Sequence, residues 1–285
     1  MMNSRLLVLG CRGQVGRLLV QRAIAQGVVF EAFDLPELDI KDEAAIDRTV
    51  AAFAPTHILN AAAYNAVDRA EDEPEAAFST NAIGPARLAL AARRVGAALV
   101  HYSSDYVFDG RTTNGFVEED HPHPLSTYGQ SKLLGDRAVE AIWERTYILR
   151  TAWVFAPGGN NFVSRLIALA DRGVPLRFVD DQWGTPTYAA DLVDATFALL
   201  LREAPFGLYH AVGSRVCTPF EWARSALAIA RPDTSVTPVP ATAFSTRAPR
   251  PQRSILRNAR LMALGIAMPD GLARLSDYFE TPEAP

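Results

Sequence analysis

Hydrophobic and polar positions in the first half of the chain alternate between two kinds of pattern. Short apolar runs predict buried strands over 6–9, 30–33, 57–59, 98–101 and 147–149. Between them, apolar residues recur at intervals of three and four, which predicts helices over 15–26, 43–53, 74–95 and 128–145. Strands that alternate with helices are typical of βαβ units with right-handed crossovers. We therefore expect an α/β fold, a Rossmann-like doubly wound parallel sheet.

The pattern changes after residue 150. It predicts a helix over 161–172, a strand over 176–179, a helix over 189–201 and a strand over 207–212, followed by a segment rich in proline and basic residues. We interpret residues 1–157 and 188–213 as a dinucleotide-binding domain. Residues 158–187 and 214–285 are expected to form a smaller substrate-binding lobe over the carboxyl ends of the strands.

Composition narrows the class of protein. Of 285 residues, 49% are hydrophobic and 21% charged, as in ordinary globular proteins, and the net charge of -4 gives no reason to expect nucleic acid or an anionic membrane as partner. Two cysteines, Cys11 and Cys217, are too few for a disulfide scaffold. The apolar run after the first residues is too short for a signal peptide. These features predict a cytoplasmic protein with Cys11 as a packed residue.

A glycine-rich loop, Gly10-Cys11-Arg12-Gly13-Gln14-Val15-Gly16, follows the first strand and opens the first helix. Glycines permit a tight turn there, and the helix N-terminus offers amide donors to a pyrophosphate. The spacing is GxxGxxG rather than GxGxxG, and a purely structural turn between strand and helix is the alternative. The loop predicts a dinucleotide site.

Residues after the next strands extend this prediction. Asp34 can bind the ribose hydroxyls of NADH, whereas Arg12 could hold a 2′-phosphate, so both NADH and NADPH are acceptable. Asp39 and Ile40 could lie beside adenine, although a solvated loop acid is equally compatible. The remaining candidates are small or amide residues, Ala61, Ala62, Ala63 and Asn81, the last of which either bridges backbone groups or faces water.

A phenol and an ammonium lie one helical turn apart, at Tyr128 and Lys132. Residues four apart share a helix face, and a neighbouring cation is expected to lower the pKa of the tyrosine. With the hydroxyl of Ser104, this trio suits hydride transfer to a ketone, Tyr128 giving the proton. The alternative is a Tyr and a Lys that decorate an ordinary helix.

Histidines do not suggest a metal site. His57 and His101 lie in or beside predicted strands, and His121 and His123 occupy a proline-rich loop without a third ligand. We assign no metal.

Several motifs in order carry a resemblance to a known family. They are the glycine loop and the segments 60–71, 103–110, 128–132, 153–155, 159–162, 181–187, 207–210 and 250–254. Together they closely resemble dTDP-4-dehydrorhamnose reductases, a family of extended short-chain dehydrogenase/reductases, over residues 5 to 256. The resemblance implies an oxidoreductase of dTDP-rhamnose and polysaccharide biosynthesis. Such an enzyme moves hydride from NAD(P)H to the 4-keto group of dTDP-4-dehydro-L-rhamnose, and the family often forms homodimers.

The resemblance also assigns roles to residues. Tyr128 is the acid, Lys132 tunes it and holds the nicotinamide ribose, and Ser104 polarises the carbonyl. The residues expected to contact the sugar nucleotide are Val67, Asp68, Ser104, Asp105, Tyr106, Trp153, Asn161, Gln182 and Arg250. For the last three, the alternatives are a helix cap, a polar loop residue and a surface charge.

Departures from the family pattern leave the substrate open. Ser104 stands where threonine is usual, Phe155 replaces a common tyrosine, and Asn65 occupies a position that is often threonine. One alternative is therefore another nucleotide-sugar 4-ketoreductase, with a different sugar or stereochemistry. A second, of another class, is a non-catalytic dinucleotide-binding subunit similar to the regulatory subunit of methionine adenosyltransferase. The intact trio favours catalysis.

Overall fold

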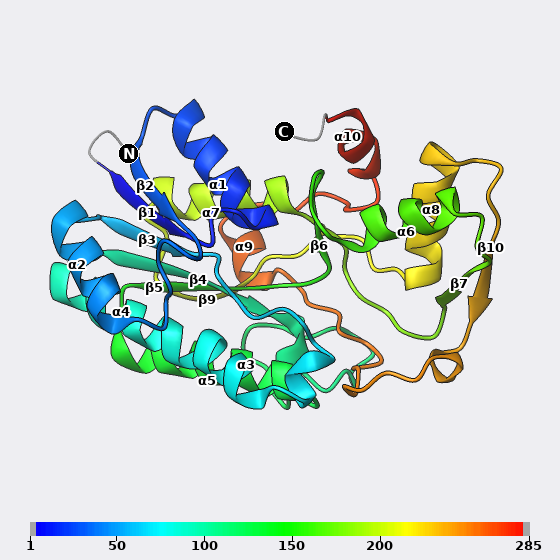
Figure 1. The fold of residues 1–285 in the computed structure, drawn as a ribbon, viewed down its shortest axis with the longest axis horizontal. Helices are drawn as coiled ribbons and strands as arrows, with labels where there is room; N and C mark the ends of the chain where they lie inside the picture. Colours follow the sequence, from blue (N-terminus) through cyan, green and yellow to red (C-terminus); the bar gives the residue numbers. More distant parts are fainter. Residues whose placement is uncertain (1–3, 282–285) are drawn as a thin grey trace.

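A six-stranded parallel sheet forms the centre of the computed structural model, which describes residues 4–281 (Figure 1). Its strands are β1 (Arg5–Leu9), β2 (Val29–Phe33), β3 (His57–Asn60), β4 (Ala98–Ser104), β5 (Thr146–Thr151) and β9 (Gly207–His210). They are ordered β2-β1-β3-β4-β5-β9. The direction of winding reverses between β1 and β3, and a doubly wound sheet binds ligands at such a switch point. The predicted Rossmann-like fold is confirmed.

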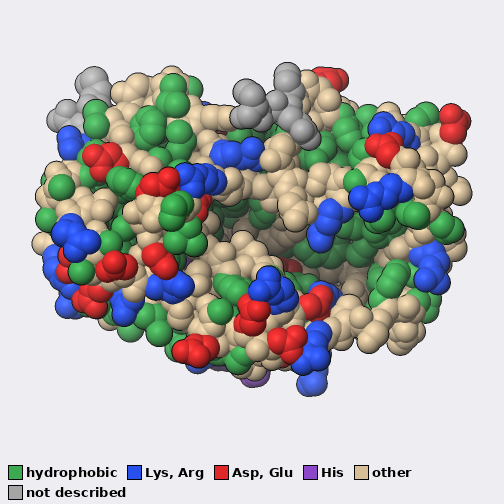
Figure 2. Space-filling view, in the orientation of Figure 1, with side chains coloured by type: hydrophobic (Ala, Val, Ile, Leu, Met, Phe, Trp, Pro, Cys, Tyr) green, Lys and Arg blue, Asp and Glu red, His purple; other side chains and the backbone are tan. Residues whose placement is uncertain are grey.

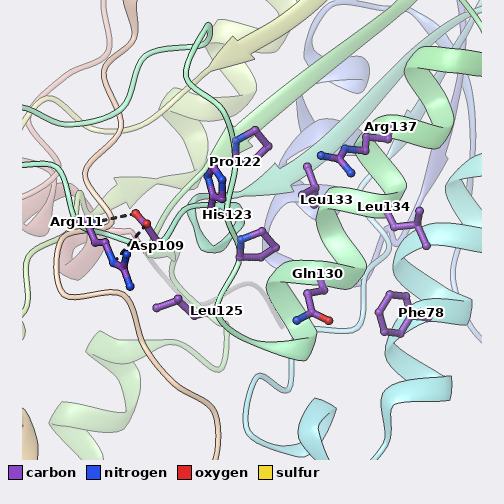
Figure 3. A pocket seen from close by; sticks show the side chains of 11 residues that line it. Phe78, Asp109, Arg111, Pro122, His123, Leu125, Gln130, Leu133, Leu134 and Arg137 are labelled. Atoms are coloured by element: carbon purple, nitrogen blue, oxygen red, sulfur yellow. Dashed lines mark hydrogen bonds and ion pairs between the residues drawn. The ribbon is translucent and has the colours of Figure 1, made fainter.

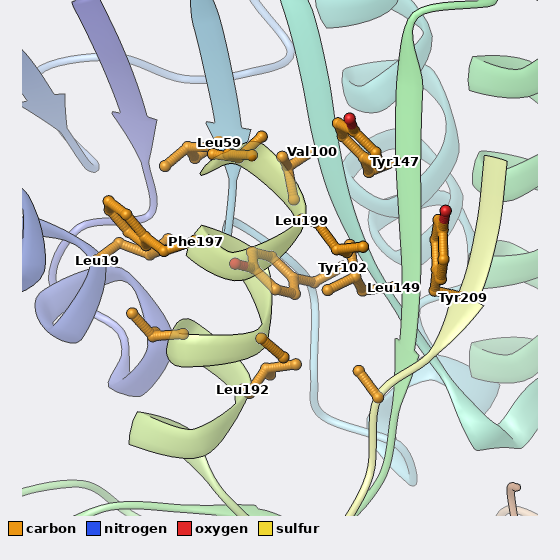
Figure 4. Close-up of a cluster of buried hydrophobic side chains, with 14 of the residues drawn as sticks. Leu19, Leu59, Val100, Tyr102, Tyr147, Leu149, Leu192, Phe197, Leu199 and Tyr209 are labelled. Atoms are coloured by element: carbon orange, nitrogen blue, oxygen red, sulfur yellow. The ribbon is translucent and has the colours of Figure 1, made fainter. Parts of the chain in front are cut away.

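Helices cover both faces of this sheet. One face carries α1 (Gln14–Ala25) and α7 (Ala189–Leu201), and the other carries α2 (Glu43–Phe53), α4 (Gly84–Val95) and α5 (Thr127–Ile142). Figure 4 shows the first core, where Leu19 of α1, Leu59 of β3 and Phe197 of α7 meet. Strands β1, β3, β4 and β5 are buried almost throughout, which explains why their sequences are continuous apolar runs. The prediction of a buried strand over 30–33 is wrong: β2 is only partly buried, because it lies at the edge of the sheet.

The lobe lies beside the sheet (Figure 1). It packs around a separate core rich in aromatic residues. Its elements are β6 (Val154–Phe155), α6 (Phe162–Asp171), β7 (Leu176–Val179), β8 (Thr187–Tyr188), α8 (Pro219–Ala230), β10 (Val236–Val239) and α10 (Leu275–Glu280). Strand β10 pairs with β7, and β6 with β8. Helix α9 (Ala259–Ala263) returns to β9, and Leu261 joins the core of the main sheet. The domain boundaries stay a prediction.

The predicted helix over 74–95 is not one regular α-helix. It consists of α3 (Pro74–Phe78), a π-helical turn η2 (Ser79–Ile83) and α4. The wide turn contains Asn81, whose side chain accepts a hydrogen bond from the Tyr64 amide at 2.8 Å and donates to the Tyr64 carbonyl at 3.0 Å. Periodicity alone does not reveal a single inserted residue of this kind.

Within residues 4–281, no helix combines the length and the apolar character that crossing a bilayer requires.

Candidate active site

The glycine loop makes a turn that larger side chains would block. Gly10 has φ +76°, and a Cβ there would lie 2.5 Å from the Ala62 amide nitrogen. A Cβ on Gly16 would lie 2.0 Å from the Gly10 carbonyl oxygen. Strand β3 therefore approaches the loop closely, and the first amides of α1 face the switch point of the sheet. These features fit a dinucleotide pyrophosphate.

Acidic and basic groups meet at the far end of this loop. Asp34, directly after β2, accepts hydrogen bonds from the amides of Arg12 and Leu35, each at 2.8 Å. The Arg12 guanidinium pairs with Glu37 at 2.5 Å. A cavity of about 320 Å³ lies here, lined by Gly10, Gly13, Asp34, Leu35, Leu38, Asp39, Ile40, Lys41, Ala61, Ala62, Ala63, Asn65 and Thr80. Its lining contains Asp34, Asp39 and Ile40, which were expected around the adenosine, but not Arg12.

A second cavity, of about 340 Å³, continues from the first. The two share Gly13, Ala61, Ala63 and Asn65. The second is also lined by all three members of the expected trio, Ser104, Tyr128 and Lys132, and by Gln14, Val15, Asp105 and Trp153. In Figure 2 the surface is hollowed between the sheet and the lobe. The two cavities together form a path from Asp34 to Tyr128.

Tertiary structure places the trio at one point. Ser104 is the last residue of β4, and Tyr128 lies in the first turn of α5. Ser126 caps that helix by accepting a hydrogen bond from the Gly129 amide at 3.1 Å. Gly129 is needed because a Cβ would lie 2.2 Å from the Tyr106 carbonyl oxygen. Ser104 and Tyr128 line the same cavity as Lys132.

The electrostatics of Tyr128 differ from the prediction that a nearby cation lowers its pKa. Burial raises the pKa of Tyr128, since removal from water disfavours the phenolate, and the nearby Ser104 side chain opposes this only in part. Lys132 donates to the Tyr102 carbonyl at 2.6 Å, and burial lowers the pKa of Lys132 to about 8. The charges of Asp105 and Asp136 raise the pKa of Tyr128 further, so the side chain is held as a neutral phenol.

A buried ionic group under Lys132 was missed by the sequence analysis. Asp136 lies one turn further along α5, accepts from Arg150 Nε at 3.0 Å, and is 3.7 Å from His101 Nε2. The Asp136 carboxylate raises the pKa of Lys132, against the larger effect of burial. The i, i+4 spacing from Lys132 was the available signal, because it puts both side chains on one face of the helix.

Lys132, Asp136 and Arg150 belong to the α5 side of the cleft, which we call the wall. Asn81 contacts this wall from the π-helical turn η2. Its amide donates to Ser131 Oγ at 3.0 Å, and Ser131 donates to the Tyr128 carbonyl at 2.7 Å. Of the two roles considered for Asn81, bridging backbone groups beside the site is confirmed. The contact fixes α5 to the π-helical turn.

Aromatic and acidic groups lie beside Tyr128 and Ser104. Tyr106 packs edge-on against Tyr128 with ring centroids 5.7 Å apart, and Val67 packs on the same cluster. Ser104 donates to Asp105 at 3.0 Å. Burial raises the pKa of Asp105 to about 6, partly offset by hydrogen bonds from Ser254 and Ser104. Ser254 is a further residue that the sequence analysis missed.

Trp153 is held in an unusual conformation at the lobe end of the cavity. Its φ is 45°, and its indole stacks on Trp222 at 5.6 Å. A Cβ on Gly184 would lie 2.3 Å from the Trp153 ring. A left-handed backbone for a bulky residue is costly and persists only where packing enforces it. The Trp153 side chain lines the cavity next to the trio.

The three residues expected to contact the nucleotide lie in different local environments. Asn161 is a buried N-cap of α6, and its amide donates to Gln14 at 2.9 Å. Gln182 is half-buried in a loop of the lobe. Arg250 pairs with Asp68, donating to both carboxylate oxygens at 2.9 and 2.8 Å. The helix cap considered for Asn161 is therefore present, and two predicted substrate contacts bind each other.

A larger cavity, of about 610 Å³, contains none of the trio (Figure 3). It lies on the outer side of α5, where Gln130, Leu133 and Arg137 face the loop that carries Asp109 and His123. The cavity is more open and lacks the buried polar groups of the cleft. The cleft that contains Tyr128 is therefore the candidate active site.

The fold, the glycine loop and the trio together define an NAD(P)-dependent α/β oxidoreductase of the extended short-chain dehydrogenase/reductase class. A model of the RmlD substrate binding domain matches residues 4–281. The chain belongs to this family, that of the dTDP-4-dehydrorhamnose reductases.

Relatives agree with this assignment. The chain is 40% identical over 271 residues to dTDP-4-dehydrorhamnose reductase of Streptomyces griseus, covering 93% of this chain and 89% of the relative. It is 32% identical over 277 residues to spore coat polysaccharide biosynthesis protein SpsK of Bacillus subtilis, covering 97% of each. A crystal structure of dTDP-4-dehydrorhamnose reductase from Bacillus anthracis in complex with NADP superposes with a TM-score of 0.94 at 34% identity, over 98% of this chain and 99% of that one.

Proposed function

We propose that this protein reduces the 4-keto group of dTDP-4-dehydro-L-rhamnose to give dTDP-L-rhamnose. The observation that carries the proposal is the second cavity, which brings Ser104, Tyr128 and Lys132 together at the end of a dinucleotide-shaped path. Relatives that carry the name of this reductase match nearly the whole chain, which supports the substrate assignment.

The bound NADPH or NADH would supply the hydride. The glycine loop with Gln14 and Val15 would hold the pyrophosphate, Asp34, Asp39 and Ile40 the adenosine, and Ala61 to Ala63 the backbone side of the path. Lys132 would hold the nicotinamide ribose. Asn81 acts at one remove, because its contacts are with Tyr64 and Ser131.

Tyr128 donates its proton to the carbonyl oxygen as hydride reaches the carbon, and Ser104 stabilises the developing alkoxide. A raised tyrosine pKa suits this direction, since the phenol carries its proton at neutral pH. Asp105, Tyr106, Val67 and Trp153 would border the sugar.

The test is an NAD(P)H oxidation assay with a panel of 4-keto sugar nucleotides. We expect oxidation only when such a substrate is added, and the product configuration at C4 is determined by NMR. Oxidation with a different sugar alone would favour another 4-ketoreductase. Coenzyme binding without turnover on any member would favour the non-catalytic subunit. Homodimer formation and a cytoplasmic location stay predictions.

A further inference from the structure

A segment of the lobe crosses back to the main sheet beside the active site. We call residues 246–254 the strap. In Figure 1 this orange segment reaches the cyan loop before α3. The lobe holds one end, where the Trp183 amide donates to the Gln252 carbonyl at 2.8 Å and the Ser254 amide donates to the Trp183 carbonyl at 3.0 Å.

Asp68 holds the other end of the strap. Its Oδ1 accepts from the amides of Arg247 and Ala248 at 3.1 and 3.0 Å and from Arg250 Nη1 at 2.9 Å. Its Oδ2 accepts from Arg250 Nη2 at 2.8 Å. One carboxylate thus fixes both the backbone of the strap and the guanidinium. The pair lies next to Tyr106, whose pKa both charges influence.

The geometry leaves one edge of the guanidinium open. Arg250 Nη1 donates to Asp68 and to the Ala248 carbonyl, at 3.0 Å, and Nη2 donates once to Asp68. An arginine carries five N–H donors. Within residues 4–281, Nε–H and the second Nη2–H have no partner among the hydrogen bonds of the structure. These two parallel donors form a fork that matches two phosphate oxygens.

We propose that Asp68 is a positioning residue: it holds Arg250 end-on so that the Nε edge of the guanidinium binds the diphosphate of a nucleotide-linked substrate. The inference deepens the proposed function and rests on it for the identity of the nucleotide. Asp68 therefore acts through Arg250 rather than on the sugar.

Binding of dTDP, dTMP and thymidine to the purified full-length protein tests this without turnover. In Asp68→Asn, the dissociation constant of dTDP should rise about tenfold while that of thymidine stays unchanged. Arg250→Lys keeps the charge but loses the planar fork, so it should weaken dTDP binding by a similar factor. With substrate, Asp68→Asn should raise KM more than it lowers kcat.

Asp72→Asn is the matched control. Asp72 pairs with Arg247 on the same strap, but neither group is among the predicted substrate contacts. It should leave dTDP binding unchanged. The decisive comparison is Asp68→Asn made in an Arg250→Gln background, where it should have no further effect on dTDP affinity.

Three results would overturn the proposal. They are an unchanged dTDP affinity in Asp68→Asn, a tighter one, which would make Asp68 a competitor of the phosphate, and a loss that persists in the Arg250→Gln background. If Asp68→Asn does not fold, Arg250→Lys and Arg250→Gln still decide whether the fork binds the diphosphate. Failure of the reductase assay with dTDP binding lost as expected would reject the substrate but not the role of Asp68.

Discussion

The two sides of the active-site cleft use charged residues in opposite surroundings. On the α5 side, Lys132, Asp136 and Arg150 are 2–4% exposed. On the strap, the side chains of Asp68 and Arg250 are 48% and 23% exposed, and those of Asp72 and Arg247 49% and 64%. Buried charges shift each other's pKa and are costly to separate, whereas exposed pairs are screened and replaceable. The wall therefore suits proton chemistry and the strap suits reversible binding.

Replacement of the phenol should give the largest effect. In Tyr128→Phe, kcat should fall about 10²–10⁴-fold because the alkoxide loses its proton donor, while NAD(P)H still binds. Steady-state kinetics and a fluorescence titration of the coenzyme check this. Near-normal turnover would contradict the role of Tyr128 as the proton donor.

Removing the buried ammonium should affect two functions at once. Lys132→Met deletes the donor to the Tyr102 carbonyl and the expected contact to the ribose. We expect weaker coenzyme binding together with lower turnover, measured on the same protein preparation. A loss of turnover at unchanged coenzyme affinity would limit Lys132 to tuning Tyr128.

The buried carboxylate should be more important for stability than any strap residue. Asp136→Asn leaves Arg150 buried without its anion, and loss of one partner of a buried pair typically costs about 3–5 kcal/mol. Urea unfolding measures this. A change below about 1 kcal/mol would show that Arg150 is better solvated than its burial indicates.

The pH dependence follows from Lys132. Its folded pKa of about 8 lies below the unfolded value of about 10.4, so the unfolded chain binds more protons between these values. Stability from this group should therefore rise with pH across that interval, while activity falls above about pH 8 as the charge is lost. Asp136→Asn should move the fall in activity to lower pH, because Asp136 raises the pKa of Lys132. An unmoved profile would exclude that coupling.

The exposed pair should give the smallest effect. Asp72→Asn breaks the ion pair with Arg247, where both side chains are about half exposed, and exposed pairs contribute about 0–1 kcal/mol. The free energy of unfolding in urea should barely change, and the change should be smaller still in high salt. A loss as large as that of Asp136→Asn would abolish the contrast between wall and strap.

Much of the fold and part of the site could be predicted from sequence. Strands such as Leu6–Leu9 follow from apolar runs, and Gly10, Gly13 and Gly16 follow from a turn whose spacing is local. The pairing of Asp68 with Arg250 joins residues 182 positions apart, and no local pattern specifies it. Asp68 and Arg250 were each expected to contact substrate. Their contact with each other was not predicted.

By itself the sequence determined the βαβ order, the glycine-rich turn and the shared helix face of Tyr128 and Lys132, because periodicity, glycine spacing and an i, i+4 pair are properties of neighbouring residues. Only the tertiary structure decided how these groups behave. Burial raised the pKa of Tyr128 instead of lowering it. Tertiary packing placed Asp136 against Arg150 and joined the strap to Asp68. Desolvation and long-range pairing depend on which distant segments meet, and that is settled when the sheet and the lobe pack.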